Sequence, residues 1–124
     1  MRLFPAALIL SLLPAAPVIA QPTLASATPA ADTVVARPTR LTLAFSEPVT
    51  AAADAIDLVM TAMPGMKDHP PMPIRGFATT TGADRRSLVA VLPRPLPAGS
   101  YRLRWRVTGS DGATVEGQYA FSAR

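Results

Sequence analysis

The chain has 124 residues, a formal net charge of +4 and no cysteine, and proline accounts for 14 of its residues. This length suits one domain. The proline content argues against an all-helical protein, because each interior proline costs a helix about 3 kcal/mol. The lack of cysteine excludes disulfides, thiolate zinc sites, iron–sulfur clusters and cysteine nucleophiles. A single histidine, His69, excludes any site that needs two imidazoles from one chain.

The N-terminal residues have the pattern of a secretory signal peptide. Arg2 provides a positive start, residues 3–13 are an apolar run, and Val18 and Ala20 place small residues at −3 and −1 of a cleavage point. A transmembrane helix needs about 20 apolar residues, and this run is shorter. We therefore predict a signal peptide over residues 1–20, bacterial export, and a mature domain over residues 21–124.

Several short segments alternate apolar and polar residues, which is the period-two pattern of strands with one buried face. In residues 101–107, two aromatic and two aliphatic side chains alternate with Arg102, Arg104 and Arg106. The arginines are expected to face solvent and Trp105 the core. The other predicted strands are residues 24–27, 41–45, 56–60, 74–79, 88–92 and 115–121. About seven short strands separated by turns predict an all-β, Ig-like β-sandwich.

The most informative segment is residues 60–72, which hold the histidine and all the methionines beyond Met1. A step of three residues scatters side chains around a helix and alternates them between the faces of a strand. A polyproline-like path has three residues per turn and aligns them. Because prolines are interspersed, we predict an irregular, proline-stiffened loop that presents five side chains together. At intervals of three, they are Met60, Met63, Met66, His69 and Met72.

The donor chemistry of this segment favours copper. Thioether sulfur is soft, neutral and carries no proton, so it suits Cu(I) and suits Zn²⁺, Mg²⁺ or Ca²⁺ poorly. In a secreted chain without thiols, methionine and histidine are the remaining ligands for Cu(I). Two other interpretations stay open. The methionines can form an apolar contact surface of a metal-free Ig-like interaction module, or they can simply fill the core.

The segment resembles the methionine-rich loop of the periplasmic copper-resistance proteins CopC and PcoC. Further likeness follows in the family's order: the Pro-Ala start at residues 26–30, the Phe-Ser-Glu strand at 41–49, and the L-x-x-G-x-Y motif at 96–101. Trp105, the aspartate turn at 109–112 and the G-x-x-x-F motif at 117–121 complete it. The resemblance implies a cupredoxin- or Ig-like Greek-key β-sandwich (barrel) in the periplasm. It also implies one Cu(I) per chain in the Met/His loop.

The family's Cu(II) site is not carried over. Members that also bind Cu(II) use an N-terminal histidine, an aspartate in a turn, and a second histidine just after it. Here the predicted mature N-terminus is Gln21, and Ala113 stands where the second histidine belongs, so only Asp111 is kept. Cu(II) prefers nitrogen and oxygen ligands in a tetragonal plane. We therefore expect weak or absent Cu(II) binding and interpret Asp111 as a turn residue.

These features predict a Cu(I) carrier or buffer in copper homeostasis and resistance rather than an enzyme. A copper enzyme with an N-terminal histidine brace ranks lowest, because it needs a histidine that Gln21 replaces. The expected partners are the copper ion and a CopD-like inner-membrane copper transporter or a periplasmic copper oxidase. We expect a monomer. Nucleic acid is not expected, because the arginine row lacks interleaved exposed aromatic residues.

Overall fold

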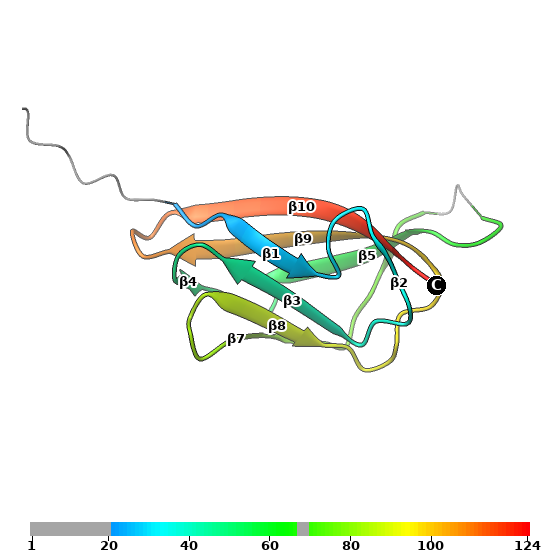
Figure 1. Cartoon of the computed structure of the whole chain (residues 1–124), viewed down its shortest axis with the longest axis horizontal. Coiled ribbons are helices and arrows are strands. Elements are labelled where there is room, and N and C mark those ends of the chain that lie inside the picture. The colour runs from blue at the N-terminus through cyan, green and yellow to red at the C-terminus, as the bar shows by residue number, and fades with distance from the viewer. Residues whose placement is uncertain (1–20, 67–69) are drawn as a thin grey trace, which may run out of the picture.

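The computed structural model describes residues 21–66 and 70–124 (Figure 1). The predicted signal peptide and His69 lie outside these residues. Two β-sheets pack face to face, which confirms the predicted all-β sandwich. Seven of the ten described strands have three or more residues, and the other three are two-residue segments. Among the described residues, no helix has the length and apolar character needed to cross a membrane.

The first sheet has four antiparallel strands in the order β1-β3-β8-β7. Their bounds are Leu24–Thr28 (β1), Arg40–Phe45 (β3), Thr79–Thr81 (β7) and Ser87–Val91 (β8). The second sheet has the order β2-β10-β9-β5-β6, with β4 also paired to β9. Its bounds are Val34–Val35 (β2), Val49–Thr50 (β4), Ile56–Ala62 (β5), Met72–Pro73 (β6), Gly99–Gly109 (β9) and Thr114–Ala123 (β10). Only β2, which lies parallel to β10, departs from antiparallel pairing among these described strands.

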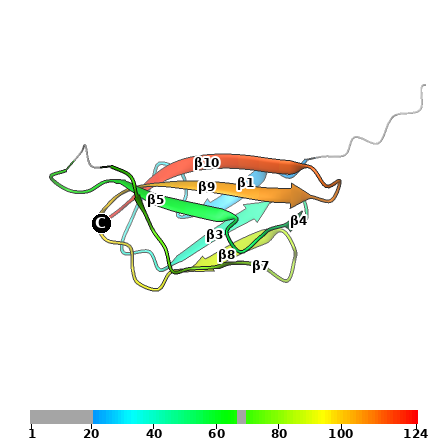
Figure 2. The same ribbon diagram turned by 180° about the vertical axis from the view of Figure 1, so that it is seen from behind.

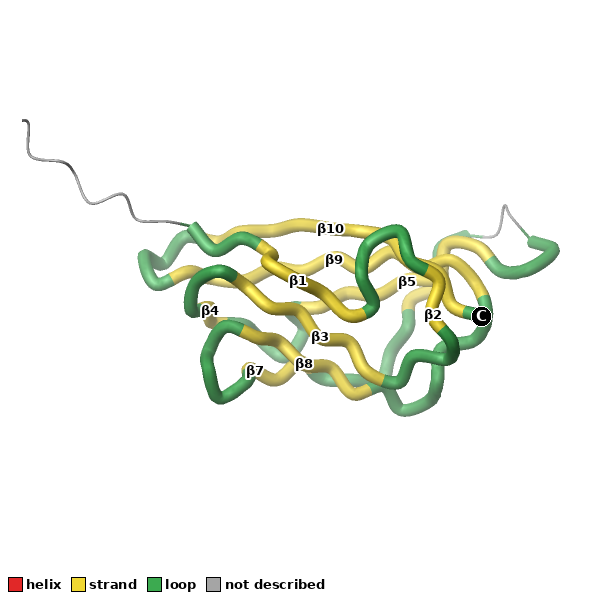
Figure 3. The backbone as a smooth tube through the Cα atoms, in the orientation of Figure 1, coloured by secondary structure: helices red, strands yellow, loops and turns green. Residues whose placement is uncertain are grey.

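The predicted strand over residues 74–79 is wrong. Most of this segment is the connection that crosses from the second sheet to the first, and β7 begins only at Thr79 (Figures 2 and 3). Ile74 still donates a backbone hydrogen bond of 2.8 Å to the Leu58 carbonyl oxygen. Pro73 has no N–H for a ladder, and Gly76 takes a positive φ of 90°, so the strand cannot continue.

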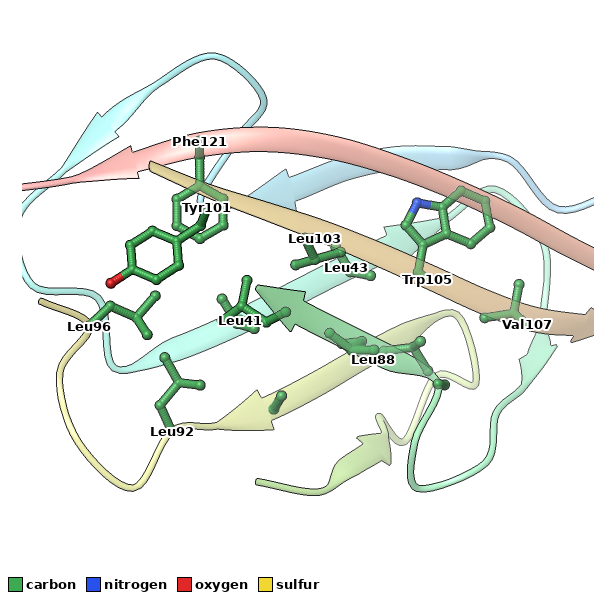
Figure 4. Packing of buried hydrophobic residues seen from close by; sticks show 14 of the residues in the cluster. Leu41, Leu43, Leu88, Leu92, Leu96, Tyr101, Leu103, Trp105, Val107 and Phe121 are labelled. Atoms are coloured by element: carbon green, nitrogen blue, oxygen red, sulfur yellow. The ribbon is translucent and has the colours of Figure 1, made fainter. Parts of the chain in front are cut away.

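The inward row of β9 supplies much of the core. Tyr101, Leu103 and Val107 are almost fully buried, and Figure 4 shows them facing leucines of the first sheet. The rings of Tyr101 and Phe121 stack with their centroids 5.5 Å apart. Trp105 is buried and meets Phe45 edge to face, with a centroid distance of 5.0 Å. The predicted core role of Trp105 is therefore confirmed.

The outward row of β9 carries the three arginines, as the alternation predicts. Arg104 and Arg106 are exposed, whereas Arg102 is partly covered beside Val59 of the neighbouring strand. Arg106 forms an ion pair of 3.3 Å with Glu116, which lies directly opposite on β10. Both side chains of this pair are well exposed, so it contributes at most about 1 kcal/mol to stability.

Gly117 of β10 leaves the space that the indole ring of Trp105 occupies. It lies directly opposite Trp105, and an added Cβ would come under 3.0 Å from three indole atoms. We expect Gly117→Ala to lower the free energy of unfolding by about 1–3 kcal/mol, the usual cost of overpacking. Urea denaturation followed by Trp105 fluorescence measures it. The control Gln118→Ala changes an exposed neighbour and should stay within about 0.5 kcal/mol. An unchanged midpoint for Gly117→Ala would contradict this packing.

Candidate metal centre

The methionine segment forms a hairpin that extends β5 and returns as β6. Beyond Ala62, Met63 and Met66 exchange two backbone hydrogen bonds, with N···O distances of 3.3 and 3.0 Å. Between them lie Pro64 and Gly65, and Gly65 has a φ of +79°. Proline followed by a residue with positive φ is the sequence that a type II turn favours. Figure 1 shows this loop projecting past the sheets, at the end where the chain terminates.

The predicted polyproline-like path is therefore wrong for the described part of the loop. The positive φ of Gly65 reverses the chain after Pro64, and the reversal lets Met63 and Met66 pair. Proline at the second position of a turn stabilises such a reversal as readily as an extended path. His69, the only non-methionine candidate ligand, lies outside the described residues.

A bulge in β5 decides which face the methionines occupy. Up to Met60, each residue of β5 lies opposite its partner on β9 in regular register, but Ala62 then pairs with Ser100, so Thr61 is an extra residue. In a regular strand, a step of three would place Met60 and Met63 on opposite faces. One inserted residue reverses the alternation beyond it. Met63 therefore shares the core-facing side with Met60 and packs against the core.

Cross-strand pairing adds the other two methionines to the same side. Met72 lies directly opposite Met60, and Met66 lies directly opposite Met63. Side chains of directly opposed residues extend to the same face, with Cβ atoms about 4.5–5.5 Å apart. The four thioethers on this side differ in how far they are exposed to solvent. Met60 is 4% exposed, Met63 is half-buried, and Met72 and Met66 are 51% and 54% exposed.

Gly99 makes room for this bulge from the facing strand. A Cβ at Gly99 would lie 2.5 Å from the Ala62 carbonyl oxygen and 3.3 Å from the Met60 methyl carbon. Two residues later, the Tyr101 hydroxyl donates a 2.6 Å hydrogen bond to the Pro97 carbonyl oxygen. Burial raises the pKa of Tyr101 to about 12, so the hydroxyl keeps the proton that it donates. This hydrogen bond anchors the loop that contains Pro97 to β9.

The other end of the sandwich holds the aspartate turn. Asp111 accepts a 3.0 Å hydrogen bond from the Ala113 backbone N–H, so its predicted role as a turn residue is confirmed. Within residues 21–66 and 70–124, no three histidine, cysteine, aspartate or glutamate side chains lie close enough to hold a metal ion. The turn and the hairpin lie at opposite ends of β9, a strand about 33 Å long at 3.3 Å per residue.

The described residues thus define a class: a small β-sandwich that carries a cluster of thioethers at one end. Such a donor set suits a soft metal ion and offers little to hard cations.

Comparison with known proteins agrees with this class. Residues 24–124 match the CopC domain family. Copper resistance protein C of Escherichia coli is 42% identical over 106 residues, which cover 86% of this chain and 83% of the relative. Its counterpart in Pseudomonas syringae pv. tomato is 38% identical, covering 85% and 82%. The crystal structure of PcoC, a methionine-rich copper resistance protein from Escherichia coli, is 39% identical with a TM-score of 0.73, covering 85% and 100%. The chain belongs to the CopC family.

Sequence reasoning missed two residues that shape the site, Thr61 and Gly99. A bulge is a relation between two strands, so nothing in residues 56–62 alone announces it. A signal was nevertheless present. A three-residue spacing of methionines on a strand places them on one face only if a residue is inserted. The glycine of the L-x-x-G-x-Y motif marks where the facing strand makes room.

Gly99→Ala tests the placement of the bulge. The new methyl group would collide with the Ala62 backbone, so we expect a loss of about 1–3 kcal/mol in unfolding free energy. We also expect shifted methyl resonances of Met60 and Met63 in methionine-methyl-labelled protein. Ser100→Ala, on the opposite face, is the matched control. Unmoved Met60 and Met63 signals in Gly99→Ala would show that Gly99 does not support the hairpin.

Proposed function

We propose that this chain is a periplasmic copper-binding protein of copper resistance and homeostasis, which holds one Cu(I) in its methionine hairpin as carrier or buffer. The single observation that carries the proposal is the register of the hairpin. It gathers Met60, Met63, Met66 and Met72 on one side at an exposed end of the sandwich. His69 follows Met66 by three residues in the sequence and is the fifth candidate ligand. The curated relatives carry the name copper resistance protein C.

The graded exposure of the thioethers suggests different roles for them. Met66 and Met72 are open to an incoming ion, and Met63 is half-buried between them and the core. Met60 is buried and also belongs to the core cluster. Five candidates are more than a soft-metal site commonly requires, so Met60 is the one whose packing role competes most with metal binding.

Cu(I) is preferred over Cu(II) because the donors are soft. Gln21 and Ala113 occupy positions where Cu(II)-binding members of the family carry histidine, and Asp111 is engaged in its own turn. An aspartate without neighbouring imidazoles does not supply the tetragonal nitrogen and oxygen set of Cu(II). The lack of these histidines also argues against a histidine-brace enzyme and favours a protein that binds and transfers copper.

Export and partners complete the proposal. Residues 1–20 act as a signal peptide, and the mature copper-binding domain spans residues 21–124 as a monomer. The protein then exchanges copper with a CopD-like inner-membrane transporter or a periplasmic copper oxidase. The tip of the hairpin projects past the ends of both sheets, so such a partner can approach the exposed Met66 and Met72 (Figure 1).

Copper loading in both oxidation states tests the proposal. The purified mature protein should retain one Cu(I) through gel filtration under reducing, anaerobic conditions. The same protein titrated with Cu(II) should give only weak binding by EPR and by quenching of Trp105 fluorescence. Met72→Leu should weaken Cu(I) binding by at least about tenfold, or 1.4 kcal/mol. Met60→Leu is the matched control. Among leucine substitutions of the four methionines Met60, Met63, Met66 and Met72, it should weaken Cu(I) binding least.

Three outcomes would contradict parts of the proposal. No Cu(I) retention would favour a metal-free interaction module that uses the methionines as an apolar contact. Tight one-to-one Cu(II) binding with a nitrogen-rich tetragonal spectrum would refute the preference for Cu(I). The largest loss of affinity in Met60→Leu would show that the buried thioether is a principal ligand.

The pH dependence of Cu(I) affinity follows from the ligand chemistry. Thioethers have no proton to lose, so only His69 makes copper compete with a proton, and an unperturbed histidine titrates near pH 6.5. Affinity should fall below that pH with a slope of at most about one decade per pH unit. His69→Met should bind Cu(I) with almost no pH dependence. Chelator competition from pH 5 to 8 measures both, and a slope near two would reveal a second titrating ligand.

A further inference from the structure

The charges of the sandwich are divided unevenly between its two ends. The end with the methionine hairpin carries five exposed arginines, which we call the arginine collar: Arg37, Arg40, Arg75, Arg94 and Arg124. Of the described acidic residues, only Asp32 lies in the same half of the sandwich, beside Ala120 of β10. Asp57 and Glu116 lie farther along the second sheet, and Glu47, Asp54, Asp84 and Asp111 lie in the opposite half. Lys67 and Asp68, outside the described residues, carry opposite charges.

Backbone pairing places Arg124 and Arg37 next to the base of the hairpin. Ala62, where the hairpin begins, pairs with Ser100, and the adjacent Gly99 pairs with Ala123. Arg124 follows Ala123 directly, and its carbonyl oxygen accepts a 3.3 Å hydrogen bond from the Arg37 backbone N–H. These two guanidinium groups therefore belong to the same end surface as the thioethers.

The other three collar residues lie at the same end, at the start of β3 and in the segments that follow β6 and β8. Arg40 begins β3 and lies opposite Val91, the last residue of β8. Arg94 follows in the loop after β8, which hydrogen-bonds to the segment before β3 through Leu96 and Pro38. Arg75 precedes Gly76, where an added Cβ would lie 3.4 Å from the Pro93 ring. Figures 1 and 2 show these loops together at the hairpin end.

None of the collar guanidinium groups is in an ion pair with another described residue. The ion pair found in the described chain, Arg106 with Glu116, lies on the second sheet away from this end. A group of unpaired like charges raises the energy of the compact state and creates a field that attracts anions. The cluster lies at the same end as exposed Met66 and Met72, so its field acts on any partner that approaches them.

We propose that the hairpin end is the docking face for a copper-exchange partner whose own metal-exchanging surface is acidic. The proposal rests on the Cu(I) function above, because transfer requires the partner's ligands to reach Met66 and Met72. Charged groups around an interface chiefly steer the encounter and set its orientation. The collar therefore directs an acidic partner so that the two sets of ligands meet at the thioethers.

A membrane surface fits this end less well. Proteins that lie on anionic lipid insert tryptophan, phenylalanine or leucine beside their basic residues. The described aromatic side chains, such as Phe77, Trp105 and Tyr119, are buried or half-buried. The exposed apolar side chains at this end are those of two methionines, Met66 and Met72, and of two edge valines, Val34 and Val91.

Two synthetic acceptor peptides test the proposal. Both carry the same Met-x-x-Met core, and one is flanked by aspartate and glutamate, the other by lysine. Cu(I)-loaded protein should transfer copper to the acidic peptide about ten times faster at low salt, as expected for electrostatic steering. The two rates should converge at about 0.5 M salt, where charges are screened within a few ångströms.

A pair of charge-reversal variants locates the effect. Arg94→Glu combined with Arg124→Glu should abolish the preference for the acidic peptide. Arg85→Glu combined with Arg104→Glu changes the net charge equally but lies away from the hairpin end, and it should keep the preference. Equal loss in both double variants would assign the effect to net charge and overturn the docking face.

Copper-free measurements separate this proposal from the Cu(I) function. In an NMR titration of the apo protein, the acidic peptide should shift the amide signals of residues 94, 99 and 124 and leave those of residues 110–112 unmoved. Cu(I) retention with equal transfer to both peptides overturns the docking face alone. Failure to retain Cu(I) overturns the function, and the apo titration then decides on the docking face. Stronger binding to phosphatidylglycerol vesicles than to the acidic peptide would also overturn it.

Discussion

Strand β9 is the constraint on which the rest of this structure depends. It pairs with β10 along almost its whole length, with β5 over residues 100–105, and with β4 at its far end. Its inward side chains form one wall of the core, and its outward ones form the basic face of the second sheet. A one-residue slip of this strand would exchange the two rows. The position of Gly99, and with it the base of the candidate metal centre, is therefore fixed by the same register that buries Trp105.

The bulge at Thr61 brings the methionines to one face of the hairpin and so forms the candidate site. A bulged residue loses its ladder partner and bends the strand. Here the Thr61 hydroxyl donates a 3.3 Å hydrogen bond to the Ser100 carbonyl oxygen, which offsets part of that loss. The result is a candidate metal-binding loop whose two ends are both anchored in a sheet. An ion bound by the four methionines would therefore meet donors whose backbone is already paired, and the loss of conformational entropy at these residues would be small.

The sequence predicted the fold where structure is local and failed where it depends on contacts between segments. The alternation of apolar and polar residues over 101–107 predicts a strand, because the polarity of each side chain indicates whether it is buried or exposed. Residues 74–79 also contain apolar side chains, but Pro73 and Gly76 divert that segment between the sheets. The donor types of the site were visible in the spacing of the methionines. Their arrangement was not, because it results from the pairing of β5 with Gly99 and from the reversal at Gly65.

The unequal exposure of the methionines also has a consequence for oxidative chemistry. A thioether sulfur that reagents can reach is converted to methionine sulfoxide, which is polar and chiral and no longer a soft donor. Met66 and Met72 are open to oxidants, whereas Met60 is enclosed by the core. A metal ion bound to an outer sulfur takes one of its two lone pairs, draws electron density from the sulfur and makes it less reactive toward an oxidant. If the hairpin binds copper as proposed, the loaded form would resist methionine oxidation and the empty form would be the more readily oxidised one.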